Sequence, residues 1–268
     1  MPEIVHLDRP SDGVALVTVT NPAIRNHGSW EAIEALARAL ASARESGARV
    51  VVLASGVPGH WLEHAWLRDL ANMVTGKPTS GDGAAWFHCV RELSRTHVVS
   101  IAAISGDCSG GGAELGWACD LRIAEEQVCF SQPEVLIGLA TGLGGTSRLV
   151  RLVGRTVAAE MVLDGAPLPA RRIFELGGVN RVVPTGQSLP HALEWAARLA
   201  QRPAHALAAE KQMLAEAEER PLSDALANEQ KLFQGVVVRP DAIEQMQRIQ
   251  ARFDAGESIR SVYGPPRR

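Results

Sequence analysis

The chain has 268 residues, of which 46% are hydrophobic and 21% charged, an ordinary globular composition that excludes wholesale disorder. With 27 Lys and Arg against 30 Asp and Glu, the formal net charge is -3. A general binder of nucleic acid or of an anionic membrane needs a basic excess, so both classes are excluded. The apolar runs are too short to cross a bilayer, and the first residues do not resemble a signal peptide. We therefore expect a cytoplasmic protein.

Strand and helix patterns alternate through the first two thirds of the chain. Short β-branched runs predict strands, and apolar residues at helical spacing predict the helices between them. In chain order these are a strand at 14–20, a helix at 29–46, a strand at 49–54, a helix at 84–94, a strand at 98–104, a helix at 112–119 and a strand at 121–124. Such alternation predicts an α/β fold with a largely parallel sheet.

After about residue 183 the pattern becomes helical. Four stretches each open with Pro at or near the first turn, as helices often do. They cover residues 190–200, 203–219, 221–236 and 240–255. We therefore predict an α/β core over 1–195 and a C-terminal helical region over 196–268. The segment 75–83 (TGKPTSGDG) is interpreted as a loop or lid, and the tail 263–268 as loosely held.

Three consecutive glycines, Gly110 to Gly112, connect a buried strand to a helix. This arrangement points free backbone N–H groups at whatever lies above the helix N-terminus, which favours a phosphate or a developing oxyanion. A P-loop is excluded because no Gly-Lys-Ser/Thr follows, and the dinucleotide motif lacks its third glycine. An oxyanion hole is the better interpretation.

Two glutamates lie close to this turn in otherwise apolar sequence. Glu114 is in the first turn of the predicted helix, and Glu134 follows the next strand. Apolar surroundings raise the pKa of a carboxyl group toward neutrality, and two carboxyl groups in one pocket can divide the roles of acid and base. From the residues alone, Glu114 could equally be a helix-terminus residue and Glu134 a solvated loop residue.

The run GGGAELGWACDLRIAEEQVCFSQPEVLIGLATGLGGTSRLVRLVG resembles the signature region of the crotonase superfamily, the enoyl-CoA hydratases and isomerases. The similarity extends upstream to NPAIRN (21–26) and downstream over 158–184, so it covers essentially the whole chain. The resemblance implies a crotonase-like superhelix of ββα units. It also implies C-terminal helices that complete a homotrimer, often paired into a hexamer.

The resemblance further implies acyl-CoA thioesters as substrates, with two backbone N–H groups polarising the thioester carbonyl. Gly111 matches one of these donors, and Gly142 matches the glycine that shapes the pocket. Glu114 and Glu134 match the two hydratase carboxylates, of which one deprotonates water and the other supplies the α-proton. Together they favour hydration of a trans-2-enoyl-CoA. Arg25 matches a position near the CoA phosphates, and no cofactor is implied beyond the coenzyme A of the substrate.

The pattern differs in one stretch, where WLEHAWL (61–67) replaces a segment similar to Ala-Phe-Ser-Ala-Gly-Ala-Asp. His64 takes the place of the second oxyanion donor, because a backbone N–H can donate from any residue type. Ala65 replaces the glycine, and Leu67 replaces the aspartate. Trp66 adds bulk where the family wraps around CoA, so we expect Ala65, Trp66 and Leu67 to contact the substrate.

This departure leaves open both the role of His64 and the class of protein. His64 is either an added acid or base or a half-exposed residue with no chemical role, and His27 and His60 are expected nearby. We predict no metal site, since neither these histidines nor the four cysteines show a ligand spacing. The altered stretch is also compatible with other enolate chemistry, namely an isomerase, a dehalogenase or a C–C hydrolase acting on a diketone without CoA. Besides the hydratase and these other enolate chemistries, a third class stays open, a non-catalytic homologue serving as a scaffold.

Overall fold

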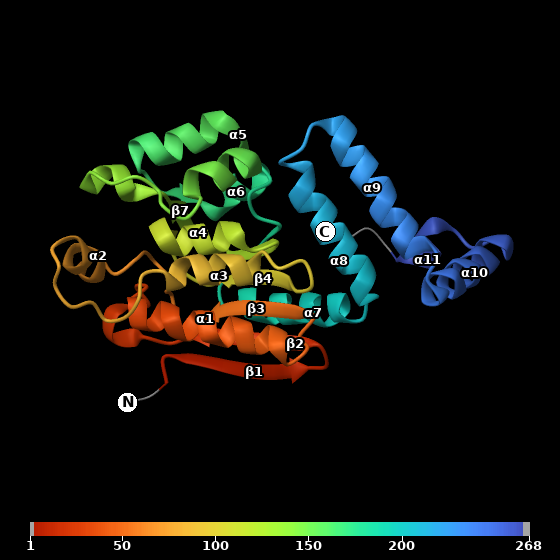
Figure 1. The fold of residues 1–268 in the computed structure, drawn as a ribbon, viewed down its shortest axis with the longest axis horizontal. Helices are drawn as coiled ribbons and strands as arrows, with labels where there is room; N and C mark the ends of the chain where they lie inside the picture. Colours follow the sequence, from red (N-terminus) through yellow and green to blue (C-terminus); the bar gives the residue numbers. More distant parts are fainter. Residues whose placement is uncertain (1–2, 265–268) are drawn as a thin grey trace. The chain divides into compact units, whose positions relative to one another are not determined.

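A computed structural model describes residues 3–264, so residues 265–268 of the predicted loose tail lie outside the described residues. The chain forms two compact units that divide between Ala204 and His205. The first unit is α/β and the second is helical (Figure 1). The boundary predicted at residue 195 falls inside helix α7 (Ser188–Ala200), which packs on the sheet of the first unit.

The main sheet of the described chain has six strands in the order β1-β2-β3-β4-β6-β9. Their bounds are Val5–Ser11 (β1), Val14–Val19 (β2), Val50–Ser55 (β3), Val99–Ile104 (β4), Leu121–Glu125 (β6) and Arg181–Val183 (β9). β1 pairs antiparallel with β2, and each later neighbouring pair is parallel. The prediction of an α/β fold with a largely parallel sheet is confirmed.

Helices cover both faces of this sheet. Those of the first unit are Trp30–Glu45 (α1), Leu67–Val74 (α2), Ala85–Leu93 (α3), Gly110–Ala118 (α4), Gly145–Asp164 (α5), Ala170–Glu175 (α6) and α7, with short 3-10 helices at Pro22–Ile24 (η1) and Pro133–Ile137 (η2). In β3, Val51 and Leu53 join the core beneath α1 and α3, whereas Val50 and Val52 join the core beneath α7. Successive strand residues point to opposite faces, which is why this strand is apolar from Val50 to Ala54.

A second sheet of three short strands carries the chain toward the glycine turn. It consists of Cys108–Ser109 (β5), Cys129–Ser131 (β7) and Leu168–Pro169 (β8), with β5 parallel to β7. β5 leads directly into α4, and β7 leads through Gln132 into η2. The helix containing Glu114 and the turn containing Glu134 therefore start from neighbouring parallel strands.

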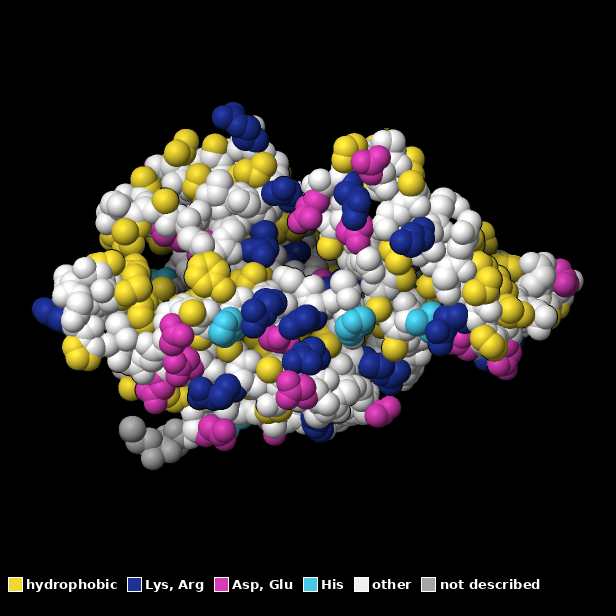
Figure 2. Space-filling model, in the orientation of Figure 1, with side chains coloured by type: hydrophobic (Ala, Val, Ile, Leu, Met, Phe, Trp, Pro, Cys, Tyr) yellow, Lys and Arg dark blue, Asp and Glu magenta, His cyan; other side chains and the backbone are white. Residues whose placement is uncertain are grey.

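The second unit consists of helices, as the prolines predict. They are Ala204–Ala217 (α8, which begins one residue before this unit), Leu222–Val237 (α9), Pro240–Asp254 (α10) and Ile259–Tyr263 (α11). Among the described helices, none combines the length and apolarity that a membrane crossing requires. Figure 2 shows hydrophobic side chains gathered over α9 to α11 on the face in view.

Candidate active site

The N-terminus of α4 forms one wall of the site. Gly110 adopts a left-handed φ of 48°, which glycine tolerates, and the first turn of α4 is wholly buried. The N–H groups of a first helical turn have no acceptor within the helix. Gly111 therefore presents a backbone N–H at the start of a buried helix.

The second backbone donor beside Gly111 belongs to Ala65 rather than to His64. The Glu63 carbonyl accepts from the Ser109 N–H at 2.8 Å, and the His64 carbonyl accepts from the Gly28 N–H at 2.7 Å. A planar trans peptide directs its N–H opposite its carbonyl, so the His64 N–H points away from Ser109.

The Ala65 N–H, by the same argument, points away from Gly28. The Ala65 nitrogen lies 3.5 Å from the point where a Cβ on Gly111 would be. By this geometry the Ala65 N–H faces Gly111, one residue after the His64 N–H that we expected to do so. The one-residue change matters because the peptides before and after His64 are held by different segments, the first by Ser109 and the second by Gly28.

The Trp86 ring packs against Gly28 and Gly111. A Cβ on Gly28 would lie 2.6 Å from this ring, and one on Gly111 would lie 3.0 Å from it. Trp86 is buried in α3, and Gly28 forms the bridge with Ala65. One rigid ring thus sets the separation between the start of α4 and the turn that pairs with Ala65, which the sequence pattern did not reveal.

Glu114 belongs to α4, and its carboxyl group reaches the beginning of α5, where Oε1 accepts hydrogen bonds from the N–H groups of Leu143 (2.7 Å) and Gly145 (2.8 Å). Its residue exposure is only 3%. These two N–H groups and the positive end of the α5 dipole hold the Glu114 carboxyl group in place. Gly142 is adjacent to this contact, and a Cβ there would meet no atom within 4 Å.

Glu134 is held by a chain of polar groups that begins in α4. The Trp117 indole N–H donates to Gln132 Oε1, and Gln132 Nε2 donates to Glu134 Oε1, each at 3.1 Å. Glu134 Oε1 also lies 3.5 Å from the Cβ position of Gly110. The carboxyl group therefore faces the same helix N-terminus as Gly111. Gln132 and Trp117 were not predicted to take part in the site.

Burial raises the pKa of Glu134 above its ordinary 4.5, and the nearby Glu114 charge raises it further. Its Oε2 is buried and has no hydrogen-bond partner among the described residues. An unpaired buried carboxylate oxygen is costly, so the protonated form is favoured. The two glutamates are thus placed in different electrostatic surroundings.

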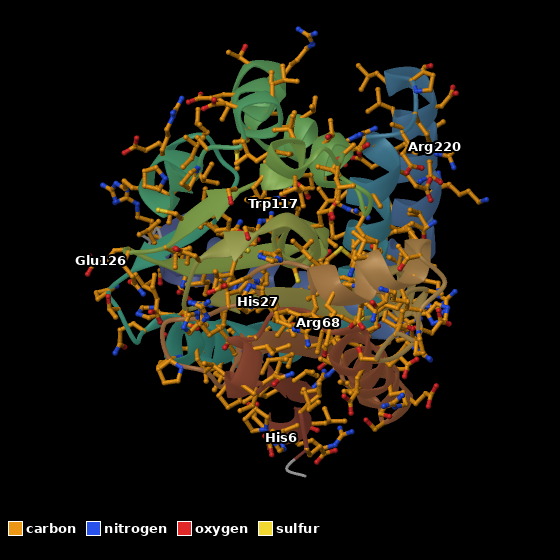
Figure 3. All side chains as sticks on the ribbon, turned by 90° about the vertical axis from the view of Figure 1, so that its left-hand side faces the viewer. His6, His27, Arg68, Trp117, Glu126 and Arg220 are labelled. Atoms are coloured by element: carbon orange, nitrogen blue, oxygen red, sulfur yellow. The ribbon has the colours of Figure 1, made fainter. Side chains whose placement is uncertain are left out.

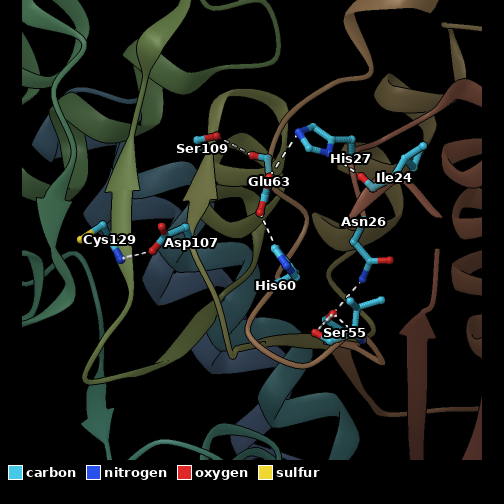
Figure 4. Close-up of polar contacts among 10 residues, drawn as sticks. Ile24, Asn26, His27, Ser55, His60, Glu63, Asp107, Ser109 and Cys129 are labelled. Atoms are coloured by element: carbon cyan, nitrogen blue, oxygen red, sulfur yellow. Dashed lines mark hydrogen bonds and ion pairs between the residues drawn. The ribbon is translucent and has the colours of Figure 1, made fainter. Parts of the chain in front are cut away.

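Histidines gather close to Ala65, and His27 and His60 lie near His64 as expected. The His27 and His64 rings lie 4.3 Å apart in an edge-to-face arrangement, and His64 Nδ1 hydrogen-bonds the Ala65 carbonyl at 2.7 Å. Glu63 contacts both His27 and His60 (Figure 4). Within residues 3–264, no group of three or more His, Cys, Asp or Glu side chains is arranged to hold a metal ion.

The remaining predicted substrate contacts lie on the exposed side of this region. Trp66 is half-buried and contacts both His27 and Arg68, which Figure 3 labels. Leu67 is 40% exposed at the start of α2, and Arg25 is exposed with a left-handed φ of 51°. No interaction of these side chains with Gly111 or the glutamates is seen in the described part of the chain.

The fold and this site together define a crotonase-type α/β protein, in which a helix N-terminus collects two glutamates and two backbone donors. The family model described as enoyl-CoA hydratase/isomerase matches residues 9–252, and the chain belongs to this family. The resemblance seen in the glycine and glutamate segment is thereby confirmed.

Relatives and solved structures agree with this assignment. The chain is 32% identical over 249 residues to "Probable enoyl-CoA hydratase 2, mitochondrial" of Arabidopsis thaliana, covering 91% of this chain and 82% of the relative. It is 32% identical over 225 residues to 2,3-dehydroadipyl-CoA hydratase of Escherichia coli (strain K12), covering 82% and 85%. A crystal structure of enoyl-CoA hydratase from Bacillus anthracis superposes with a TM-score of 0.83 at 26% identity, covering 93% and 97%.

Proposed function

We propose that this protein is an enoyl-CoA hydratase that adds water to a trans-2-enoyl-CoA thioester. The observation that carries the proposal is the placement of Glu114, Glu134 and the Gly111 and Ala65 donors around one buried helix N-terminus. The coenzyme A belongs to the substrate, and the chemistry needs no other cofactor.

The different surroundings of the glutamates assign their roles. Glu114, held by two N–H groups, takes a proton from water as the water oxygen attacks the β-carbon. The C=C electron pair moves to the thioester oxygen, where the Gly111 and Ala65 N–H groups stabilise the enolate. Glu134 then donates its proton to the α-carbon, and the proton on Glu114 leaves to solvent while Glu134 is reprotonated. The net reaction adds one water.

Substitution of each glutamate tests these roles. We expect Glu114→Gln and Glu134→Gln each to lower kcat on crotonyl-CoA by about 10²- to 10⁴-fold, since each removes one proton transfer. The measurement is the loss of enoyl-thioester absorbance. Glu160→Gln, which changes a surface ion pair with Arg172, is the control and should retain wild-type kcat. Wild-type turnover in either active-site variant would refute the role of that glutamate.

The imidazole of His64 favours a second candidate, enolate chemistry other than hydration. Its hydrogen bond to the Ala65 carbonyl places it on the strand edge toward which the Ala65 N–H points. An isomerase or dehalogenase would still bind CoA, whereas a C–C hydrolase of a diketone would not. Calorimetric titration with CoA separates these cases. Affinity for CoA without hydration of crotonyl-CoA would favour the first group.

A further inference from the structure

Glu63 connects three segments that form the candidate oxyanion hole. Its Oε2 lies 3.2 Å from His27 Nε2, and its Oε1 contacts His60 Nδ1 (Figure 4). Its backbone carbonyl accepts both the N–H and the hydroxyl of Ser109, the residue that precedes α4. The side chain is 21% exposed, so these contacts are partly shielded from water.

The turn that carries His27 is itself fixed to the sheet. Asn26 is fully buried, and its Nδ2 donates to the Val19 carbonyl at 3.0 Å and to the Ser55 hydroxyl at 2.7 Å. His27 Nδ1 hydrogen-bonds the Ile24 carbonyl, which leaves Nε2 directed at Glu63. The contact between His27 and Glu63 therefore joins a rigid turn to the segment 60–66, which forms isolated β-bridges at His60 and Ala65.

Two backbone hydrogen bonds continue this connection to the donor itself. Gly28 donates to the His64 carbonyl at 2.7 Å, and Trp66 donates to the Gly28 carbonyl at 2.9 Å. Ala65 lies between these two bonds. The direction of its N–H thus depends on how the turn pairs with the segment 60–66, and the Glu63 side chain braces that pairing two residues before Ala65.

We propose that Glu63 is a positioning residue, whose carboxylate, held by His27 and His60, fixes the Ala65 N–H for stabilisation of the enolate. This inference rests on the proposed hydratase function. Glu63 acts through the segment 60–66 and needs no contact with the substrate. Loss of alignment in a positioned donor costs about 10- to 100-fold in rate.

Kinetics of four variants test the proposal. Glu63→Gln and His27→Ala are expected to lower kcat on crotonyl-CoA by about 10- to 100-fold with KM changed less than about threefold, because the donor acts mainly in the transition state. His27→Gln can still donate to Glu63 and should retain more activity than His27→Ala. The matched control, Glu92→Gln, changes a carboxylate paired with Arg44 elsewhere and should leave kcat unchanged.

Hydrogen–deuterium exchange gives a readout independent of turnover. In Glu63→Gln and His27→Ala, the amides of Gly28 and Trp66 should exchange faster than in the wild type, while Glu92→Gln should not accelerate them. Unchanged exchange in both site variants would overturn the proposal. The proposal would also fall if the loss of kcat in these variants followed a loss of Tm and His27→Gln relieved neither. If the wild type failed to hydrate crotonyl-CoA, the proposed function would fall, and the exchange result would still decide whether Glu63 positions the segment 60–66.

Discussion

Glu134 is expected to affect stability through its raised pKa. Its pKa is raised, so folding favours its protonated form. The associated stability is fully present below the ordinary pKa of 4.5 and is lost as the pH rises through the raised value.

Glu134→Gln should therefore have a higher Tm than the wild type at pH 7, by roughly 2–4 °C for each kcal/mol in a domain of this size. The difference should disappear below about pH 4.5. Thermal unfolding at pH 7 and at a pH below 4.5 measures this difference in Tm, with Glu160→Gln as the control. A constant difference at both pH values would mean that titration of Glu134 is not its cause.

At the scale of elements, the segment 60–66 packs closely against α4. A Cβ on Gly112 would lie 1.6 Å from the Leu62 carbonyl oxygen, whereas one on Gly116 would meet nothing closer than Cys108 Sγ at 3.6 Å. The two glycines are on the same helix and differ in what covers them.

We expect Gly112→Ala to prevent accumulation of folded protein, because backbone atoms cannot yield that much space. Gly116→Ala should fold, with a gain of up to about 1 kcal/mol from helix propensity. Soluble yield and circular dichroism compare the two. Normal folding of Gly112→Ala would contradict the close approach of the segment 60–66 to α4.

The loop at 75–83, interpreted from sequence as a loop or lid, is tied to the start of α1 by Asp69. The buried Asp69 carboxylate accepts from the Trp30 N–H at 2.9 Å and from the Ser80 N–H at 2.8 Å, and it also accepts from the Ser80 hydroxyl. Burial raises its pKa, but the Ser80 and Trp30 hydrogen bonds outweigh burial and lower the pKa below 3.8.

The stability that Asp69 contributes is therefore present above about pH 3.8 and is lost as the pH falls through the lowered value. Asp69→Asn should cost about 2 kcal/mol at pH 7 and speed proteolysis within 75–83, and the cost should shrink in acid. Exposed Asp12→Asn is the control. Equal cleavage rates in wild type and Asp69→Asn would show that Asp69 does not hold the loop.

At the scale of the whole molecule, the second unit presents apolar side chains at helical spacing. Leu222, Leu226 and Phe233 of α9 are each more than half exposed, at 75%, 52% and 53%. Such a stripe on a soluble helix is typical of a face that another surface covers.

We expect a homotrimer or hexamer, as the family resemblance implies, with a mass in solution that is a multiple of three times 28.7 kDa. Phe233→Glu should dissociate it if α9 contributes to the interface, whereas exposed Gln247→Glu should not. Light scattering of both variants gives the masses. A monomeric wild type would refute the expectation.

The sequence by itself determined the alternating α/β pattern, the helical C-terminal third and the glycine turn with its two glutamates. These depend on local periodicity and on residues close together in the chain. Only the tertiary structure decided that Ala65 supplies the facing N–H, that Trp86 spaces the donors and that Gln132 and Trp117 hold Glu134. The direction of the Ala65 N–H depends on which distant segments pair with the peptides around it. No pattern within residues 61–67 contains that information, because it is fixed by Gly28 and Ser109.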